Sequence, residues 1–327
     1  MTESGGIAKR AIHTMSWGDT VFCLTSLLFL ILTLFASELT STGAVNGLRM
    51  CAQTLIPSLF PFMAVSSLIA SSGAAELLGK PFAAPCRILF GISPPGACAL
   101  VMGMLCGFPV GTKTALTLYE NGRISKGELE HILMLANIPS AAFLINATGA
   151  SLFGSKGFGI ALYTVNIISA LAVGVISRPF FGSERLTATP RKSKKKRNGI
   201  ALFTNAITDS AISMLYVCAF VVFFSALVSC VGELCSALPI REELSFALFG
   251  FFELTQGVSH ASLCLSKYTG MLLASAITGW SGMSVHFQIM SICRDHSLSF
   301  KPYFLSKLFC SVINTALMAL ILAIFHL

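Results

Sequence analysis

The sequence predicts an all-α polytopic membrane protein with about seven transmembrane helices and two re-entrant helical hairpins in an inverted repeat. The composition, the recurring apolar segments and the matching interruptions in two halves of the chain predict this class. Of 327 residues, 54% are hydrophobic and only 11% are charged, and the mean hydropathy is +0.79. Soluble domains average about a quarter charged residues, so the composition excludes an ordinary soluble protein.

Apolar segments of about twenty residues, the length that a helix needs to cross a bilayer, recur along the chain. The expected spans are Val21–Ser37, Leu48–Ser72, Leu129–Phe153, Gly157–Ser177, Asn205–Val231, Gly270–Cys293 and Tyr303–His326. Polar residues precede the first span, and no small-residue cleavage site follows it. We therefore expect a retained first span rather than a removed signal peptide.

Two further segments, Pro94–Gly122 and Glu243–Lys267, are interrupted at their centres by Gly and polar residues. The interruptions read GFPVGTK and GFFELTQG, and each flanking half is too short to cross a bilayer alone. A continuous helix would place Lys113 and Glu253 near the bilayer centre, at a cost of several kcal/mol in lipid. Re-entrant hairpins buried between other helices avoid this cost.

Positive charge predicts the orientation, because cytoplasmic loops are enriched in Lys and Arg. With a cytoplasmic N-terminus and two hairpins, most of the basic residues, including the run RKSKKKR and Lys307, fall on the cytoplasmic side. Arg49, Lys156, Arg241 and Lys267 fall outside. The basic run is expected to be a solvated loop near anionic lipid. No aromatic interleaving or soluble domain accompanies it, so nucleic acid is not an expected partner.

The interruptions recur in order along the chain. Gly107 aligns with Gly250, and at the same offset Leu135–Ala141 aligns with Thr278–Ser284. Each half reads as span, hairpin, broken span and span. An odd number of spans separates the hairpins, so they would enter from opposite faces and meet near the midplane. Inverted repeats with interrupted helices are typical of secondary transporters.

The segment Cys106–Gly149 resembles the Gate (nucleoside-recognition) domain of bacterial membrane proteins, and in particular the YlbJ/SpoVV-type sporulation integral membrane proteins. The matching motifs are Gly107–Lys113, Gly122–Glu128, Asn137 with Pro139, Phe252–Gly257 and Gly279–Ile292. The resemblance covers most of Leu48–Phe309. It implies a core like that of concentrative nucleoside transporters, in which two hairpin tips and two unwound helices surround the substrate. It also implies a link to dipicolinic acid transport toward the forespore.

The expected organisation follows from the repeat and the resemblance together. Residues 1–20 form a cytoplasmic N-terminus, 21–47 the first span and loop, 48–177 a first Gate-like repeat, 178–199 a basic cytoplasmic loop and 200–327 a second Gate-like repeat.

Polar groups at the tips and breaks are the candidate substrate-binding residues. A buried Lys113 needs a carboxylate partner, either Glu253 or an anionic substrate. Glu253 is itself a functional-site hypothesis, since it could bind substrate, carry a coupling proton or hold Lys113. The predicted substrate-binding residues are Gly107, Pro109, Gly111, Thr112, Lys113, Asn137, Ser140, Glu253, Thr255, Gln256, Ser281, Ser284 and Gln288.

No cofactor or metal site is expected, because the eleven Cys residues have no zinc-ligand spacing. Na⁺ or H⁺ is the candidate coupling ion. Asp209 is expected near the membrane surface. His260 and His286 are expected to be structural rather than proton carriers. The lipid bilayer and a small-molecule substrate are the expected partners, and homo-oligomerisation stays open.

Three functions remain in competition. The first is a secondary transporter for a small anionic or aromatic metabolite, with dipicolinic acid as the first candidate. The second is a nucleoside or ion transporter with the same core, and the third is a non-transporting sporulation scaffold. An intramembrane enzyme is not expected, because no catalytic arrangement falls at a plausible depth. In each case we expect a multi-pass protein of the bacterial cytoplasmic or forespore membrane.

Overall fold

The computed structural model describes residues 17–181 and 199–325, and within these ranges the chain forms helices joined by short connections, without a strand. The all-α class is therefore confirmed. The basic run RKSKKKR and the polar residues 1–16 lie outside the described residues.

Four segments within the described ranges are long and apolar enough to cross a membrane: Ser37–Ser72, Lys156–Phe180, Gly199–Ala237 and Lys301–Phe325. The first joins α3 (Ser37–Met50), the π-helix η1 (Cys51–Leu55) and α4 (Ile56–Ser72). The others are α9 (Lys156–Ser177) with η3 (Arg178–Phe180), α10 (Gly199–Ala237) and α15 (Lys301–Phe325). Helix α2 (Trp17–Phe35) precedes them. The chain is thus a multi-pass membrane protein that contacts the lipid bilayer.

The helix expected from Leu48 begins earlier, at Ser37. Its first part is polar, with low hydropathy, but Gly43 and Gly47 are buried against α10. A Cβ at Gly43 would lie 2.8 Å from the Cα of Ala226, so the two backbones are in close contact. This close packing explains why Ser37–Met50 is helical although its hydropathy is too low to predict a membrane span.

Helices α5 (Ala74–Phe90) and α6 (Pro94–Cys106) together are apolar enough for one span, but they bend by 94°. The described residues therefore supply four spans, or five if this pair counts as one. The expected total of seven spans and the re-entrant path of the hairpins stay predictions.

Both interrupted segments fold into pairs of packed helices, as their glycines and polar breaks predict. The first pairs α6 with α7 (Val110–Glu120), and the second pairs α11 (Glu242–Phe252) with α12 (Leu254–Ala261). A Cβ at Gly111 would lie 2.7 Å from the Cα of Gly103, and a Cβ at Gly257 only 2.1 Å from the Cα of Gly250. Gly250 therefore corresponds in position to Gly103. The expected alignment of Gly250 with Gly107 is wrong, because Gly107 lies in the tip and Gly250 lies within a helix.

Two of the expected spans are broken, as predicted. The first consists of α8 (Lys126–Leu135) and the π-helix η2 (Ala142–Leu152), with an irregular stretch between them. The second consists of α13 (Lys267–Trp280) and α14 (Gly282–Ile292), separated by Ser281 in the left-handed region at φ 77°. A non-glycine residue in this conformation costs of order 1–3 kcal/mol and persists where its surroundings require it.

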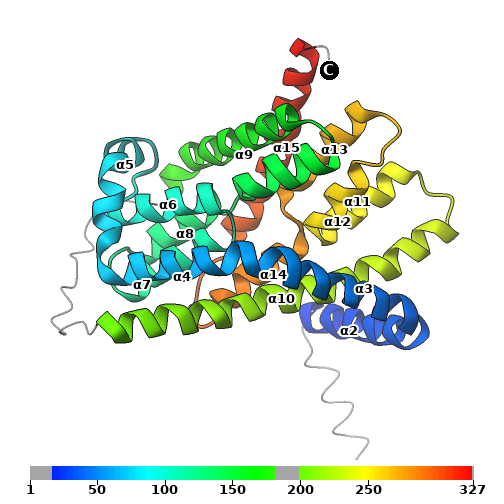
Figure 1. Ribbon diagram of the computed structural model, residues 1–327, viewed down its shortest axis with the longest axis horizontal. Helices are drawn as coiled ribbons and strands as arrows, with labels where there is room; N and C mark the ends of the chain where they lie inside the picture. The colour runs from blue at the N-terminus through cyan, green and yellow to red at the C-terminus, as the bar shows by residue number, and fades with distance from the viewer. Residues whose placement is uncertain (1–16, 182–198, 326–327) are drawn as a thin grey trace, which may run out of the picture.

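The long helices lie on opposite sides of the short ones. Helix α10 runs along one edge beside α3 and α4, and α9 and α13 lie at the other edge (Figure 1). Asn137, Glu253 and Ser281, which lie at three of the interruptions, are each at most 2% exposed. The interruptions thus fall in the interior, where lipid cannot reach their unpaired backbone groups.

Ser125 is the N-cap of α8, and its hydroxyl accepts from the Glu128 amide at 3.1 Å. The Glu128 carboxylate accepts from both the amide and the hydroxyl of Ser93, at 2.7 and 2.6 Å. Ser93 is the N-cap of α6. Glu128 therefore joins the start of α8 to the start of α6.

Replacing Gly257 by Ala should destabilise the second helix pair. The new methyl group would overlap the Gly250 backbone, which cannot move as a flexible side chain can. We therefore expect the free energy of unfolding to fall by about 1–3 kcal/mol. Gly232→Ala is the matched control, because its Cβ would make only ordinary contact at 3.6 Å with Phe249. Thermal unfolding of both purified variants checks this. Equal midpoints would contradict the close backbone contact.

Candidate functional site

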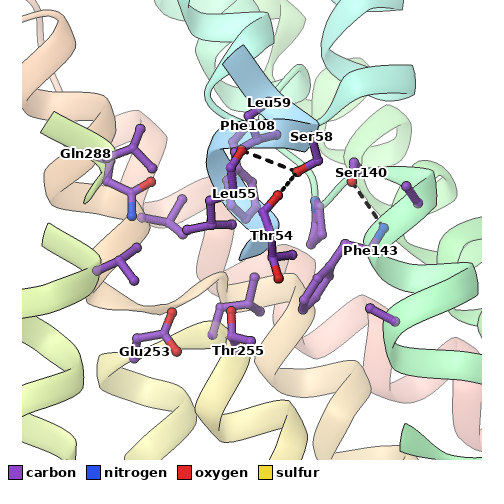
Figure 2. A pocket seen from close by; sticks show the side chains of 17 residues that line it. Thr54, Leu55, Ser58, Leu59, Phe108, Ser140, Phe143, Glu253, Thr255 and Gln288 are labelled. Atoms are coloured by element: carbon purple, nitrogen blue, oxygen red, sulfur yellow. Dashed lines mark hydrogen bonds between the residues drawn. The ribbon is translucent and has the colours of Figure 1, made fainter. Parts of the chain in front are cut away.

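A cavity of about 160 Å³ lies where the interruptions meet (Figure 2). Phe108 from the first tip, Pro139 and Ser140 from the first broken helix, and Glu253 from the second tip all line it. Residues of η1, α4, α10 and α14 complete the wall. The resemblance implies that two hairpin tips and two unwound helices surround the substrate. Residues of both tips, of the first break and of α14, the second half of the other broken helix, line this cavity.

The polar lining is sparse and comes from separate elements. Of the predicted binding residues, Ser140, Glu253, Thr255 and Gln288 line the cavity. Figure 2 shows Glu253 and Thr255 on one side of the cavity and Ser140 on another. Most remaining lining residues are apolar. A small ligand would therefore contact hydrophobic surface and a few oriented hydrogen-bonding groups, as in most small-molecule sites.

Glu253 caps helix α12. Its side chain is only 2% exposed, and its Oε2 accepts from the Gln256 amide at 2.8 Å. A carboxylate at a helix N-terminus is stabilised by the free amides and by the helix dipole. The backbone of its own helix, rather than a side-chain cation, is thus the observed partner of this buried acid.

Gln288 is held in place by a neighbour on its own helix. Its Nε2 donates to the Ser284 hydroxyl at 3.1 Å, and both residues are buried. Ser284 therefore acts on the cavity through Gln288 rather than by lining it.

Asn137 joins the first tip to the first broken helix. Its Oδ1 accepts from the Thr112 hydroxyl at 2.6 Å, and its Nδ2 donates to the Leu133 carbonyl at 2.7 Å. The next carbonyl, that of Ile138, accepts from the Phe108 amide at 3.0 Å. Thr112 and Asn137 lie outside the cavity lining, so the structure gives them a positioning role.

Lys113 is buried but lies away from the cavity lining. The ion pairs recorded for the described residues do not include one between Lys113 and Glu253, so the expected pairing of the two tips is not observed. The Glu253 carboxylate instead accepts from the Gln256 amide of its own helix. A direct role for Lys113 in substrate binding stays a prediction.

The other predicted residues shape the tips. Gly107 has φ 77°, and a Cβ there would lie 2.5 Å from the Ser140 amide, so only glycine fits. Pro109 and Gly111 begin the second arm of this hairpin, and Gln256 supplies the amide that Glu253 binds. Ser281 is fully buried, and its hydroxyl donates to the Thr278 carbonyl at 3.3 Å.

Several lining residues were not predicted from the sequence. Thr54 and Ser58 enter from η1 and α4, and Phe108 and Phe143 supply aromatic walls. Polar residues inside an apolar span, next to Pro57, could have signalled the first two. The aromatic residues carry no such signal, because Phe is abundant throughout this chain.

Lys307 is the largest correction. The charge pattern predicts that it faces the cytoplasm, but it is 1% exposed within α15, and its ammonium donates to the Asn137 carbonyl. A lysine inside an apolar span such as Lys301–Phe325 is itself a sequence signal for a buried, partnered cation.

Asp209, His260 and His286 differ in their surroundings. Asp209 is exposed on α10. The Nδ1 of His260 lies 2.8 Å from the Gln256 carbonyl, and the Nδ1 of His286 lies 3.0 Å from the Tyr303 hydroxyl. All eleven cysteines are free. No group of three or more His, Cys, Asp or Glu residues in the described ranges could hold a metal ion.

A larger cavity of about 600 Å³ lies among α8, α9 and α15. Its walls are mainly apolar, with Glu130, Ser177 and Lys301 among the polar exceptions. It contains none of the predicted binding residues and touches neither helix tip. The smaller cavity is therefore the candidate site, because only there do the interruptions and the polar groups coincide.

The fold and the cavity define a helical, multi-pass membrane protein with an internal cavity between interrupted helices. The chain is 27% identical to the sporulation integral membrane protein YlbJ of Bacillus subtilis (strain 168), over 330 residues covering 89% of this chain and 79% of that protein. The similarity therefore extends over most of the length of both proteins. No protein-family model and no solved structure matches it.

Removing the Glu253 carboxylate should weaken the start of α12. We expect Glu253→Ala to cost about 0.5–2 kcal/mol, as for other lost N-caps, and Glu253→Gln to cost less because an acceptor oxygen remains. Glu243→Ala, an exposed acid of the same helix pair, is the control. Thermal unfolding of the three variants measures the differences. A Glu253→Ala variant as stable as Glu243→Ala would show that the cap contributes nothing.

Proposed function

We propose that this chain is a secondary membrane transporter for a small anionic or aromatic metabolite, with dipicolinic acid as the first candidate substrate during sporulation. The observation that carries this proposal is the 160 Å³ cavity at the junction of the helix interruptions. Interrupted helices that meet around a small-molecule site are characteristic of secondary transporters. The relative named as a sporulation integral membrane protein supports the biological setting.

The lining chemistry suits a small aromatic ring with polar substituents. Phe108 and Phe143 supply aromatic surface, and Ser140, Thr255 and Gln288 supply hydrogen-bonding groups. Offset or edge-to-face contacts between aromatic rings are worth about 0.5–1.5 kcal/mol beyond the area that they bury. A flat heteroaromatic ligand can use both kinds of group at once.

The distribution of buried charge favours an anion over a cation. Lys113 and Lys307 lie on helices that contact the break at Asn137, next to the cavity residue Ser140. Glu253 is the acid that lines the cavity, and the amides of its own helix stabilise its charge. Lys307 in particular bonds to the break that also supplies the cavity residue Ser140, and a buried charge is screened less than an exposed one.

The finer organisation is part of this proposal. Hairpins that enter from opposite faces, a Gate-like inverted repeat and a cytoplasmic N-terminus would give the cavity access to both sides in turn. The chain would act without a cofactor and without catalysis, in the bacterial cytoplasmic or forespore membrane.

Uptake into proteoliposomes tests the proposal directly. Labelled dipicolinate should enter vesicles that contain the full chain but not empty vesicles. Gln288→Ala and Phe143→Ala should each reduce kcat/KM roughly 2- to 10-fold, because each removes about one ligand contact. Glu243→Gln, outside the cavity, should leave uptake unchanged.

Measuring uridine uptake in the same experiment tests the nucleoside alternative. The amide of Gln288 and the hydroxyls of Ser140 and Thr255 in the cavity lining favour this alternative. Uptake of uridine but not of dipicolinate would replace the anionic substrate by a nucleoside. No uptake of either by protein with a normal unfolding transition would contradict transport and favour a scaffold.

A further inference from the structure

We propose that the Lys307 ammonium is a built-in cation that occupies the main-chain carbonyl site of the first broken helix, so that this site binds no Na⁺. The inference rests on the proposed function, because it concerns how transport through this chain would be coupled. The evidence is the position and surroundings of Lys307, which are independent of any substrate.

The break between α8 and η2 exposes main-chain oxygens in the interior. Helix ends leave carbonyls without intrahelical partners, and buried carbonyls need another donor or a cation. The Ile138 carbonyl receives the Phe108 amide. The neighbouring Asn137 carbonyl receives the Lys307 ammonium, from a helix far along the chain.

The oxygen and the nitrogen of the Asn137 side chain each form a hydrogen bond elsewhere. It accepts from Thr112 and donates to the Leu133 carbonyl, and the whole residue is buried. Its main-chain oxygen is therefore presented to the interior in a fixed orientation. In secondary transporters, carbonyls of unwound helices are the groups that coordinate coupling cations.

Lys307 offers the same chemistry as a bound cation but cannot leave the protein. It lies 5.9 Å from the centre of the Tyr303 ring, a cation–π distance, and Tyr303 in turn is hydrogen-bonded to His286. Of the other titratable groups of α15, Cys310 lies one turn farther along. None of the ion pairs recorded among the described residues includes Lys307. A carbonyl and an aromatic face, rather than an acid, surround the ammonium.

A Na⁺ ion beside Asn137 would meet this ammonium at close range. Two positive charges a few ångströms apart in a buried environment repel each other strongly. A protein that holds a lysine at this position therefore excludes a sodium ion from it. Replacing the lysine by a small residue leaves the carbonyl available to a cation from solution.

The test compares thermal unfolding of the purified full-length chain in equal concentrations of NaCl and choline chloride. The wild type should unfold at the same temperature in both salts. Lys307→Ser should unfold at least about 4 °C lower in choline chloride, since a buried carbonyl loses its donor. NaCl should restore at least half of this loss, because an ion that binds only the folded state stabilises it. Lys301→Ser, an exposed lysine of the same helix, is the matched control and should show neither effect.

Three results would overturn the proposal: stabilisation of the wild type by Na⁺ over choline, an unchanged midpoint for Lys307→Ser, or a loss that Na⁺ does not restore. The last result would make Lys307 a hydrogen-bond donor only. Stabilisation of the wild type by Na⁺ overturns the proposal even where Lys307→Ser does not fold. In proteoliposomes, initial dipicolinate uptake should be the same in both salts. Absence of all uptake would contradict the proposed function, whereas the unfolding arm would still decide the role of Lys307.

Discussion

The structure depends on how it satisfies main-chain groups where helices are interrupted inside an apolar interior. In lipid or in a dry core, an unpaired N–H or C=O costs several kcal/mol, so interruptions exist only where other groups replace the lost helical bonds. Here the first tip and the first broken helix satisfy each other, through the bond from the Phe108 amide to the Ile138 carbonyl. The second tip uses the Glu253 carboxylate.

The two halves also solve a second problem in similar ways. In each hairpin, the last carbonyls of the first helix have no N–H donor within that helix. An aromatic side chain supplies a donor in both hairpins. The Tyr163 hydroxyl donates to the Met104 carbonyl at 3.0 Å, and the Trp280 indole donates to the Phe251 carbonyl at 3.1 Å. Residues with an apolar body and one polar atom suit this task, because they add a hydrogen bond without adding charge.

Much of this fold follows from the sequence because hydropathy and backbone breaks are local signals. The helices, both helix pairs and both broken spans fall where Gly, Pro and polar residues interrupt apolar runs. The site is harder to predict, since which side of a break faces a cavity depends on rotation of the helix. Glu253 and Gln288 face it, whereas Lys113 and Asn137, equally polar and equally near a break, do not. The prediction that Lys307 faces the cytoplasm is wrong because its partner is a carbonyl from the other half of the chain, which no local pattern reveals.

The packing of each hairpin determines which parts of the molecule could move. In the first half, Gly103 and Gly111 both pack against the Ala136 backbone of the broken helix, and in the second, Gly250 and Gly257 pack against Ile277. Contacts through glycine leave little room for sliding, so each hairpin and its broken helix form one unit. Helices outside both units bond to each of them: Lys307 of α15 to Asn137 of the first unit, and Asn166 of α9 to the Thr278 hydroxyl of the second unit at 3.1 Å. The cavity is lined from both units. Any motion that opened the cavity would therefore displace one unit relative to the other. The Lys307 bond, which joins α15 to the first unit, would have to be retained or exchanged during that motion.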